Sequence, residues 1–190
     1  MWSDILYGVL FEPRVTLRRL AEERPLAPAL FTFLIIIIFN LVIYRGLILQ
    51  QQYALDGVEA FLWLYQIIGA LFSCCMLFVM AGLFSLLSEL LFNKTNASGL
   101  LVCFSFAALP GILGPALYYS ASIIGLPWLG ITCSIVVGVW LLVLQILSLT
   151  EALDISVGQA IALFILPGLL ILVGLVVIIL IFALSGLGIK

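Results

Sequence analysis

The fold is decided by the stretch Thr95–Thr150, TNASGLLVCFSFAALPGILGPALYYSASIIGLPWLGITCSIVVGVWLLVLQILSLT, which contains no aspartate, glutamate, lysine, arginine or histidine. A helix of about 20 residues crosses a hydrocarbon core about 30 Å thick, so this stretch is too long for one membrane-spanning helix. The tripeptide Gly125-Leu126-Pro127 divides it, because proline cannot continue the hydrogen-bond ladder of a helix. The stretch therefore predicts two consecutive membrane spans.

The composition of the whole chain has the same character. Of its 190 residues, 66% are hydrophobic and 8% are charged, whereas soluble domains are about 45–50% apolar and about 25% charged. A soluble fold of this size could not hide so much apolar surface. Seven basic residues against nine acidic ones leave no basic patch for nucleic acid. The composition predicts an integral membrane protein in contact with the lipid bilayer and excludes a nucleic-acid partner.

Five apolar segments are long enough to cross a bilayer as helices. Their runs are continuously apolar, whereas the strands of a membrane barrel alternate in polarity. We therefore predict an all-α, polytopic membrane helix bundle over residues 26–190, preceded by a cytoplasmic interfacial amphipathic segment over residues 1–25. The five predicted spans are Leu26–Leu49, Ala60–Leu91, Ser98–Ser120, Trp128–Thr150 and Val157–Leu184.

The basic residues predict the orientation, because cytoplasmic loops are enriched in lysine and arginine. Lys94 lies between the second and third spans, and four arginines precede the first span. With the N-terminus inside, five of the seven basic residues face the cytoplasm. The prediction is a multi-pass protein with a cytoplasmic N-terminus and an external C-terminus. The four arginines are Arg14, Arg18, Arg19 and Arg24.

The segment before the first span is predicted to form a helix over Arg14–Arg24, with Pro13 at its start and Pro25 at its end. Arg18 with Glu22, and Arg19 with Glu23, are spaced as ion pairs on its polar face. The segment either anchors and orients the first span at the head groups, or docks a cytoplasmic partner or anionic lipid through Arg14, Arg18 and Arg19. Its apolar side is predicted to carry Val15, Leu17, Leu20 and Ala21.

The residue types needed for catalysis or cofactor binding are scarce. There is no histidine, which excludes histidine-based acid–base catalysis, serine–histidine nucleophiles and histidine-ligated metals. The four cysteines lie in apolar runs and are expected to be neutral thiols. We predict no catalytic residues, no cofactor and no metal. The cysteines are Cys74, Cys75, Cys103 and Cys133.

Ionisable residues inside membrane spans are the usual pointers to function. Glu89, near the inner end of span two, lies on one helical line with Ala81 and Ser85 and could face Lys94 or the basic N-terminal helix. It is either a proton or cation site or a carboxylate among the head groups. Arg45 is expected to snorkel or to pair with an acidic residue of the next loop, Asp56 or Glu59.

Other polar and small residues are interpreted as structural. The two Asn-x-Ser/Thr motifs that begin at Asn93 and Asn96 are predicted to supply a turn and a helix cap. Gly69 and Gly138 are expected to permit close helix packing. The mid-span amides are expected to join helices by hydrogen bonds. These amides belong to Asn40, Gln66 and Gln145.

Span three is predicted to be broken at Pro110, Gly111, Gly114 and Pro115, and span five at Pro167-Gly168. Broken helices are tolerated where they are buried in protein or line a wet cavity, and transporters expose backbone dipoles at such breaks. We therefore state a cavity between spans three and five as a hypothesis, with simple packing kinks as the alternative.

Several segments in order resemble the Yip1-domain family in its short prokaryotic form. LFEPRVTLRRL at Leu10–Leu20, followed by Arg24-Pro25, resembles the opening of the family. FSFAALP at Phe104–Pro110 resembles its third span, and Trp128 resembles the residue that opens its fourth. LTEALDISVGQA at Leu149–Ala160 resembles the exit from the fourth span. The five-span count and the inside-to-outside orientation agree, and the resemblance covers almost the whole chain.

The resemblance implies a function only in outline. Eukaryotic members are linked to Golgi and endoplasmic-reticulum traffic and to prenylated small GTPases, and they carry a longer cytoplasmic N-terminal region. The short segment here puts GTPase binding in doubt and suggests a bacterial cytoplasmic membrane. We expect a non-enzymatic scaffold, assembly factor or accessory subunit whose partner is another membrane protein or a second copy. The alternative is transport or handling of a small molecule or lipid.

Overall fold

The computed structural model describes residues 2–50 and 59–187, with side chains over 4–48 and 61–180. It is 92% helical, and no strand occurs in the described residues. The elements are α1 (Trp2–Phe11), α2 (Pro13–Glu23), α3 (Leu26–Gln50), α4 (Glu59–Phe92), α5 (Ala97–Ala107), the short 3₁₀ helix η1 (Leu109–Ile112), α6 (Leu113–Ile123), α7 (Pro127–Leu153) and α8 (Val157–Leu187).

Five helical segments in the described residues are long and apolar enough to cross a membrane, as predicted, so the chain is an integral multi-pass membrane protein. The third is composite, because α5, η1 and α6 follow one another. The turn before the fourth also follows the sequence prediction, with Gly125 at φ 81° and Pro127 in the first turn of α7. The segments are Leu26–Ile48, Phe61–Phe92, Ala97–Ile123, Pro127–Leu153 and Val157–Leu180.

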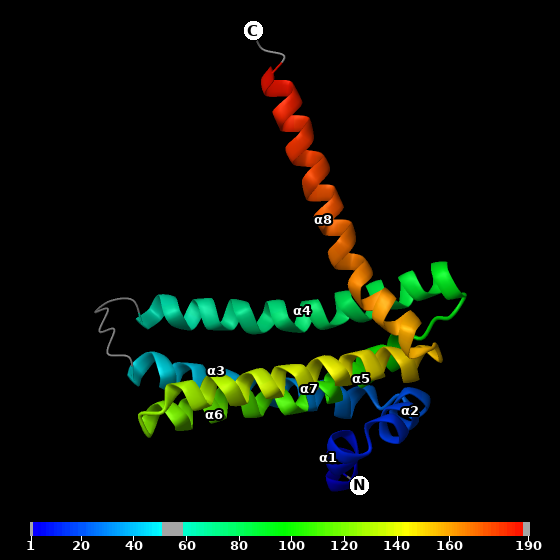
Figure 1. Cartoon of the computed structure of the whole chain (residues 1–190). Helices are drawn as coiled ribbons and strands as arrows, with labels where there is room; N and C mark the ends of the chain where they lie inside the picture. Colours follow the sequence, from blue (N-terminus) through cyan, green and yellow to red (C-terminus); the bar gives the residue numbers. More distant parts are fainter. Residues whose placement is uncertain (1, 51–58, 188–190) are drawn as a thin grey trace.

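Four of these segments run side by side, while α8 leaves them at a steep angle (Figure 1). Helices α1 and α2 lie at one end of the bundle, which is also where α4 passes into α5 and α7 passes into α8. We call this the α2 end. Helix α2 packs on α5 and α7 there, so the segment before the first span is fixed to the protein.

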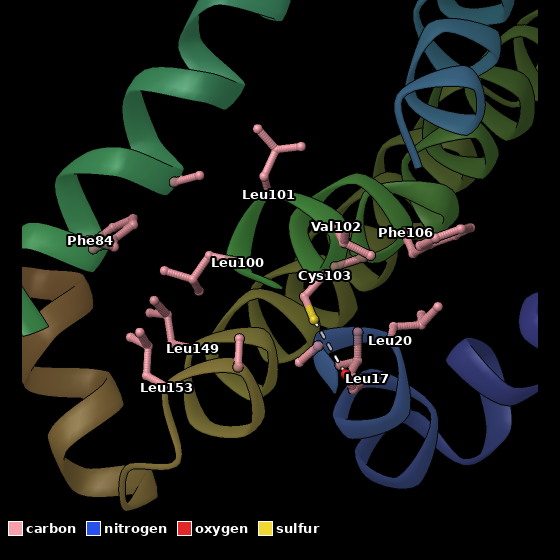
Figure 2. Packing of buried hydrophobic residues seen from close by; sticks show 14 of the residues in the cluster. Leu17, Leu20, Phe84, Leu100, Leu101, Val102, Cys103, Phe106, Leu149 and Leu153 are labelled. Carbon is pink, nitrogen blue, oxygen red and sulfur yellow. Dashed lines mark hydrogen bonds between the residues drawn. The ribbon is translucent and has the colours of Figure 1, made fainter. Parts of the chain in front are cut away.

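The tightest packing is at the α2 end and is centred on α5. Leu100, Val102 and Phe106 of α5 are fully buried. Figure 2 shows α5 between α2 on one side and Phe84 of α4 and Leu149 of α7 on the other. Lipid tails are as apolar as leucine side chains, so helices within a membrane are held together by close van der Waals contact. One end of the bundle is therefore a dense core.

Helix α2 joins this core through its apolar side. Leu17, Leu20 and Ala21 are buried, and the Cys103 thiol of α5 donates a hydrogen bond to the Leu17 carbonyl at 3.3 Å (Figure 2). Full burial of a leucine side chain is worth about 1.5–3 kcal/mol. The predicted apolar side is therefore correct except for Val15, which is 70% exposed. A position at the lipid head groups stays a prediction.

The connections at the α2 end are tied to each other. Asn93 adopts a left-handed turn at φ 53°, and the Asn96 side chain caps α5 by accepting from the Gly99 N–H at 3.1 Å. Both predictions for the Asn-x-Ser/Thr motifs are confirmed. The Asn96 amide also donates to the Ala152 carbonyl at 3.0 Å, and Lys94 pairs with Asp154 at 3.1 Å. These contacts hold the α4–α5 connection against the end of α7.

Helix α8 is packed only over its first turns. Ala160 and Leu163 are buried, and Phe164 stacks on Phe84 of α4 with ring centroids 6.1 Å apart. Pro167 lies inside the helix, where it can donate no backbone hydrogen bond. From residue 168 to residue 180 every side chain is exposed. The proline therefore lies where α8 leaves the core.

Candidate functional site

The predicted break in span three is real and takes the form of one 3₁₀ turn. Pro110 is buried in η1, and the Gly111 N–H donates to the Ala108 carbonyl at 2.9 Å, three residues back. The neighbouring helix supplies a further hydrogen bond, because the Ser134 hydroxyl lies 3.1 Å from the Gly114 carbonyl. Gly111, which has no side chain, lines open space beside this turn.

That space is part of a groove in the middle of the bundle. One hollow of about 550 Å³ lies between α3, η1–α6 and α7 and is lined by Gly111, Gly114 and Pro115. A second, of about 490 Å³, lies between α3 and α4. A third, of about 420 Å³, reaches Phe164 of α8. All three share Ser73 as a lining residue, so we treat them together as the central groove.

The hypothesis of a cavity between spans three and five stays a prediction, because the hollows of the central groove have other walls. Gly111, Gly114 and Pro115 line the groove, but neither Pro110 nor Pro167 is among its lining residues. The walls come from spans one to four, and span five contributes only Phe164. Spans three and five make no broad contact because α8 packs on α7 and α4 instead.

The polar side chains of the spans meet at this groove. Asn40 and Gln145 line the first hollow, and Asn40 and Gln66 line the second. Among the described residues no hydrogen bond joins these three amides, so the predicted interhelical hydrogen bonds are absent there. The Asn40 Oδ1 atom is buried and accepts no hydrogen bond from the described residues. An unpaired polar atom at membrane depth is costly.

The groove is otherwise neutral and partly open. None of its described lining residues is an aspartate, glutamate, lysine or arginine. Tyr44, which lines the first two hollows, is 54% exposed. The Ser73 hydroxyl already donates to the Gly69 carbonyl of its own helix at 2.8 Å. The arrangement can hold an uncharged molecule and offers no acid–base pair.

Glu89 lies apart from the groove, on the exposed side of α4 near the α2 end. Ala81 and Ser85 are buried, so the predicted small-residue line is a packing contact. Lys94, the partner considered for Glu89, is paired with Asp154 instead. Within the described residues Glu89 forms no ion pair. The position favours a solvated carboxylate over a buried proton site.

The arginines of α2 point away from the bundle. Arg18 pairs with Glu22 at 3.5 Å and Arg19 with Glu23 at 2.7 Å, which confirms both predicted pairs. The hydrogen bond that Arg19 donates to the Glu23 carboxylate raises the pKa of the Arg19 guanidinium. Exposed pairs of this kind add little stability. Arg14 is likewise exposed, so the polar side of α2 is free for contact.

Arg45 lies at the opposite end of the bundle from α2. Its guanidinium lies 4.1 Å from the ring centroid of Trp63, which links α3 to α4 by a cation–π contact. Of the partners expected from the sequence, Asp56 and the Glu59 side chain lie outside the described part. The Trp63 contact was not among the predictions.

A family model described as the Yip1 domain matches residues 7–178, from within α1 to far along α8. The chain belongs to the Yip1 domain family. No curated protein and no solved structure matches it. The match confirms the resemblance drawn from the sequence. Yip1 domain proteins are not known as enzymes.

The Yip1 domain match covers α2, the dense core and the central groove alike. Each of the mid-span amides was recognisable in the sequence as a polar residue within a span, but nothing in the sequence indicated that the three line one groove. These amides belong to Asn40, Gln66 and Gln145. Tyr44 was not predicted as a groove residue. A tyrosine in a span that is apolar on every side carries no pattern that would reveal its direction.

Proposed function

We propose that this protein is a non-enzymatic membrane scaffold, assembly factor or accessory subunit of a bacterial cytoplasmic membrane that presents α2 to a partner. The observation that carries the proposal is that the two sides of α2 differ in exposure. Its apolar side is fixed by Leu17 and Leu20, and its polar side is exposed. A fixed helix loses little conformational entropy on binding, which favours recognition.

The chemistry of the chain supports a role without catalysis. It contains no histidine, and the polar residues of the groove are amides and hydroxyls, which carry protons poorly near neutral pH. The partner is expected to be another membrane protein or a second copy of the chain.

The test is native mass spectrometry of the full chain extracted gently from its own membrane. We expect a stoichiometric partner whose bound fraction falls about tenfold in the Arg18→Glu/Arg19→Glu variant. The matched control, Arg18→Lys/Arg19→Lys, keeps the charge and should retain the partner. A C-terminal topology reporter checks that insertion is unchanged. Equal binding by the reversed variant, or a wild-type chain that is always alone, contradicts the proposal.

Handling of a small molecule or lipid is a second candidate function. The specific observation that favours it is the central groove, with Gly111, Gly114 and Pro115 in its wall and an unpaired amide oxygen beside it. Each of its three hollows has a volume within the range of known ligand sites, about 300–1,000 Å³.

A further inference from the structure

We infer that α8 is a hinged lid: in a bilayer its second half, residues 168–180, turns about Pro167-Gly168 onto α4 and closes the third hollow of the central groove. The inference goes beyond both candidate functions, because it concerns how α8 takes its place in the membrane. It starts from residues 168–180, every one of which is exposed and none of which is polar. A segment that is apolar on all sides must be covered by hydrocarbon or by protein.

The direction of α8 in the structure does not provide that cover in a membrane. The other four spans run side by side, so the α2 end lies at one membrane surface, and α8 leaves the bundle there at a steep angle (Figure 1). Its second half therefore extends more along that surface than across the bilayer. A helix at a membrane surface keeps a polar face toward water, and this segment has none. It reaches hydrocarbon along its whole length by turning toward the other spans.

The hinge lies where the packed part of α8 ends. The ring of Phe164 is stacked on that of Phe84, which fixes the first turns of α8 on α4. Pro167 lacks the backbone N–H that would bond to the Leu163 carbonyl. At Gly168 an added Cβ atom would meet nothing within 4 Å. Helices bend at such positions, so the second half can turn while the first turns stay packed.

The place for the moving half is one face of α4. Four residues of α4 that line the third hollow are separated by four, three and four positions, which places them on the same side of the helix. Phe164 lines this hollow too, so the existing contact between α4 and α8 is one end of a longer apolar face. The four residues, which we call the α4 face, are Ser73, Leu77, Met80 and Phe84.

Helix α8 carries a face with the same spacing, formed by Phe164, Gly168, Ile171 and Leu175. Because α4 ends at the α2 end and α8 begins there, the two helices are antiparallel when α8 is closed. Starting from the ring stack of the two phenylalanines, this register sets Ser73 opposite Leu175. Gly168 falls opposite Met80, whose flexible side chain can fill the space beside the glycine. The two faces are therefore complementary along the hollow, and close van der Waals contact favours their pairing in lipid.

The test is disulfide cross-linking of the full chain in phosphatidylcholine vesicles. Thiols are introduced as Ser73→Cys and Leu175→Cys, both at exposed positions, in a background without the four native cysteines. The matched control pairs Ser73→Cys with Val173→Cys, on the opposite side of α8 and exposed to nearly the same extent as Leu175. We expect oxidation by copper phenanthroline to be at least about tenfold faster in the first pair, because a disulfide requires Cα atoms within about 7 Å.

The products separate a lid within one chain from the other ways of covering α8. Maleimide-polyethylene glycol counts the remaining thiols on a non-reducing gel, and we expect a monomer band without free thiols. A disulfide-linked dimer shows that α8 packs on a second copy, and it overturns the inference. Absence of cross-linking, or equal rates for the two pairs, shows that lipid alone covers α8 and overturns it as well.

A second measurement tests the hinge and the role of the bilayer. Pro167→Ala/Gly168→Ala makes α8 continuous and should slow cross-linking at least about fivefold, whereas Leu169→Ala, at an exposed position outside the α8 face, should not. A detergent micelle covers an apolar helix in any direction, so cross-linking should also be slower in dodecylmaltoside than in vesicles. An unchanged rate in the hinge variant, or equal rates in detergent and vesicles, contradicts closure of α8 by the bilayer.

Discussion

At the scale of single residues, Gly130 shows how closely two spans approach. A Cβ atom at this position of α7 would lie 2.9 Å from the Tyr118 Cα atom and 3.0 Å from the Ala121 Cβ atom of α6. Backbone atoms cannot yield as a flexible side chain can. We therefore predict that Gly130→Ala lowers the free energy of unfolding by about 1–3 kcal/mol through overpacking, although alanine is the better helix former by about 1 kcal/mol.

The matched control is Gly138→Ala on the same helix, where an added Cβ meets nothing within 4 Å. Its thermal midpoint in detergent should equal or exceed that of the wild type, while that of Gly130→Ala falls. Equal midpoints for the two variants would show that α6 and α7 are less tightly packed than described.

These glycines also show what the sequence could not tell. Gly69 and Gly138 were expected to allow close packing, yet an added Cβ at either would meet open space, and Gly130 makes the contact instead. In the same way, the amides of Asn40 and Gln145 were recognisable as polar groups within spans. Their meeting at one groove depends on how each helix is rotated. A helix that is apolar on every side does not encode that rotation in its pattern.

At the scale of elements, the length and location of the five spans were predictable because hydrophobic runs must match the bilayer. The composite third span followed from Pro110 and Pro115, since proline lacks a backbone N–H. What covers the apolar side of α2 was not predictable. An amphipathic pattern shows that one face avoids water, but lipid and protein satisfy that need equally. The structure places Leu17 and Leu20 against α5 and α7.

The docking of α2 leads to a prediction about this element. Leu17→Ala/Leu20→Ala leaves cavities where two side chains are 0% and 1% exposed, and each buried leucine lost costs about 2–5 kcal/mol. We expect α2 to detach locally, so that trypsin cleaves after Arg18 and Arg19 at least about tenfold faster. Val15→Ala, at a 70% exposed position of the same helix, is the control and should leave cleavage unchanged. Unaltered cleavage of the double variant would argue against docking on the core.

At the scale of the whole molecule, the two parts of the bundle differ in packing. The α2 end holds the dense core, the capped connections and the Lys94–Asp154 pair. The first hollow of the central groove lies beside the 3₁₀ turn at Pro110, where η1 ends the densely packed run of α5, and the third hollow reaches back to Phe84 and Phe104 of the core. This difference in packing agrees with both candidate functions. The densely packed α2 end can present α2 to a partner, and the central groove can admit a ligand.

The division also predicts where α8 contributes to stability. Leu163 is fully buried against the core, whereas Leu172 on the same helix is 60% exposed. Leu163→Ala should lower the free energy of unfolding by about 2–5 kcal/mol, because the site is enclosed and leaves a cavity. Leu172→Ala exchanges one lipid-facing apolar group for a smaller one and should change it by less than about 0.5 kcal/mol. Unfolding in a denaturing detergent, followed by circular dichroism, measures both. If the two variants lose equal stability, α8 packs against the protein along its whole length, and the dense core is not confined to the α2 end.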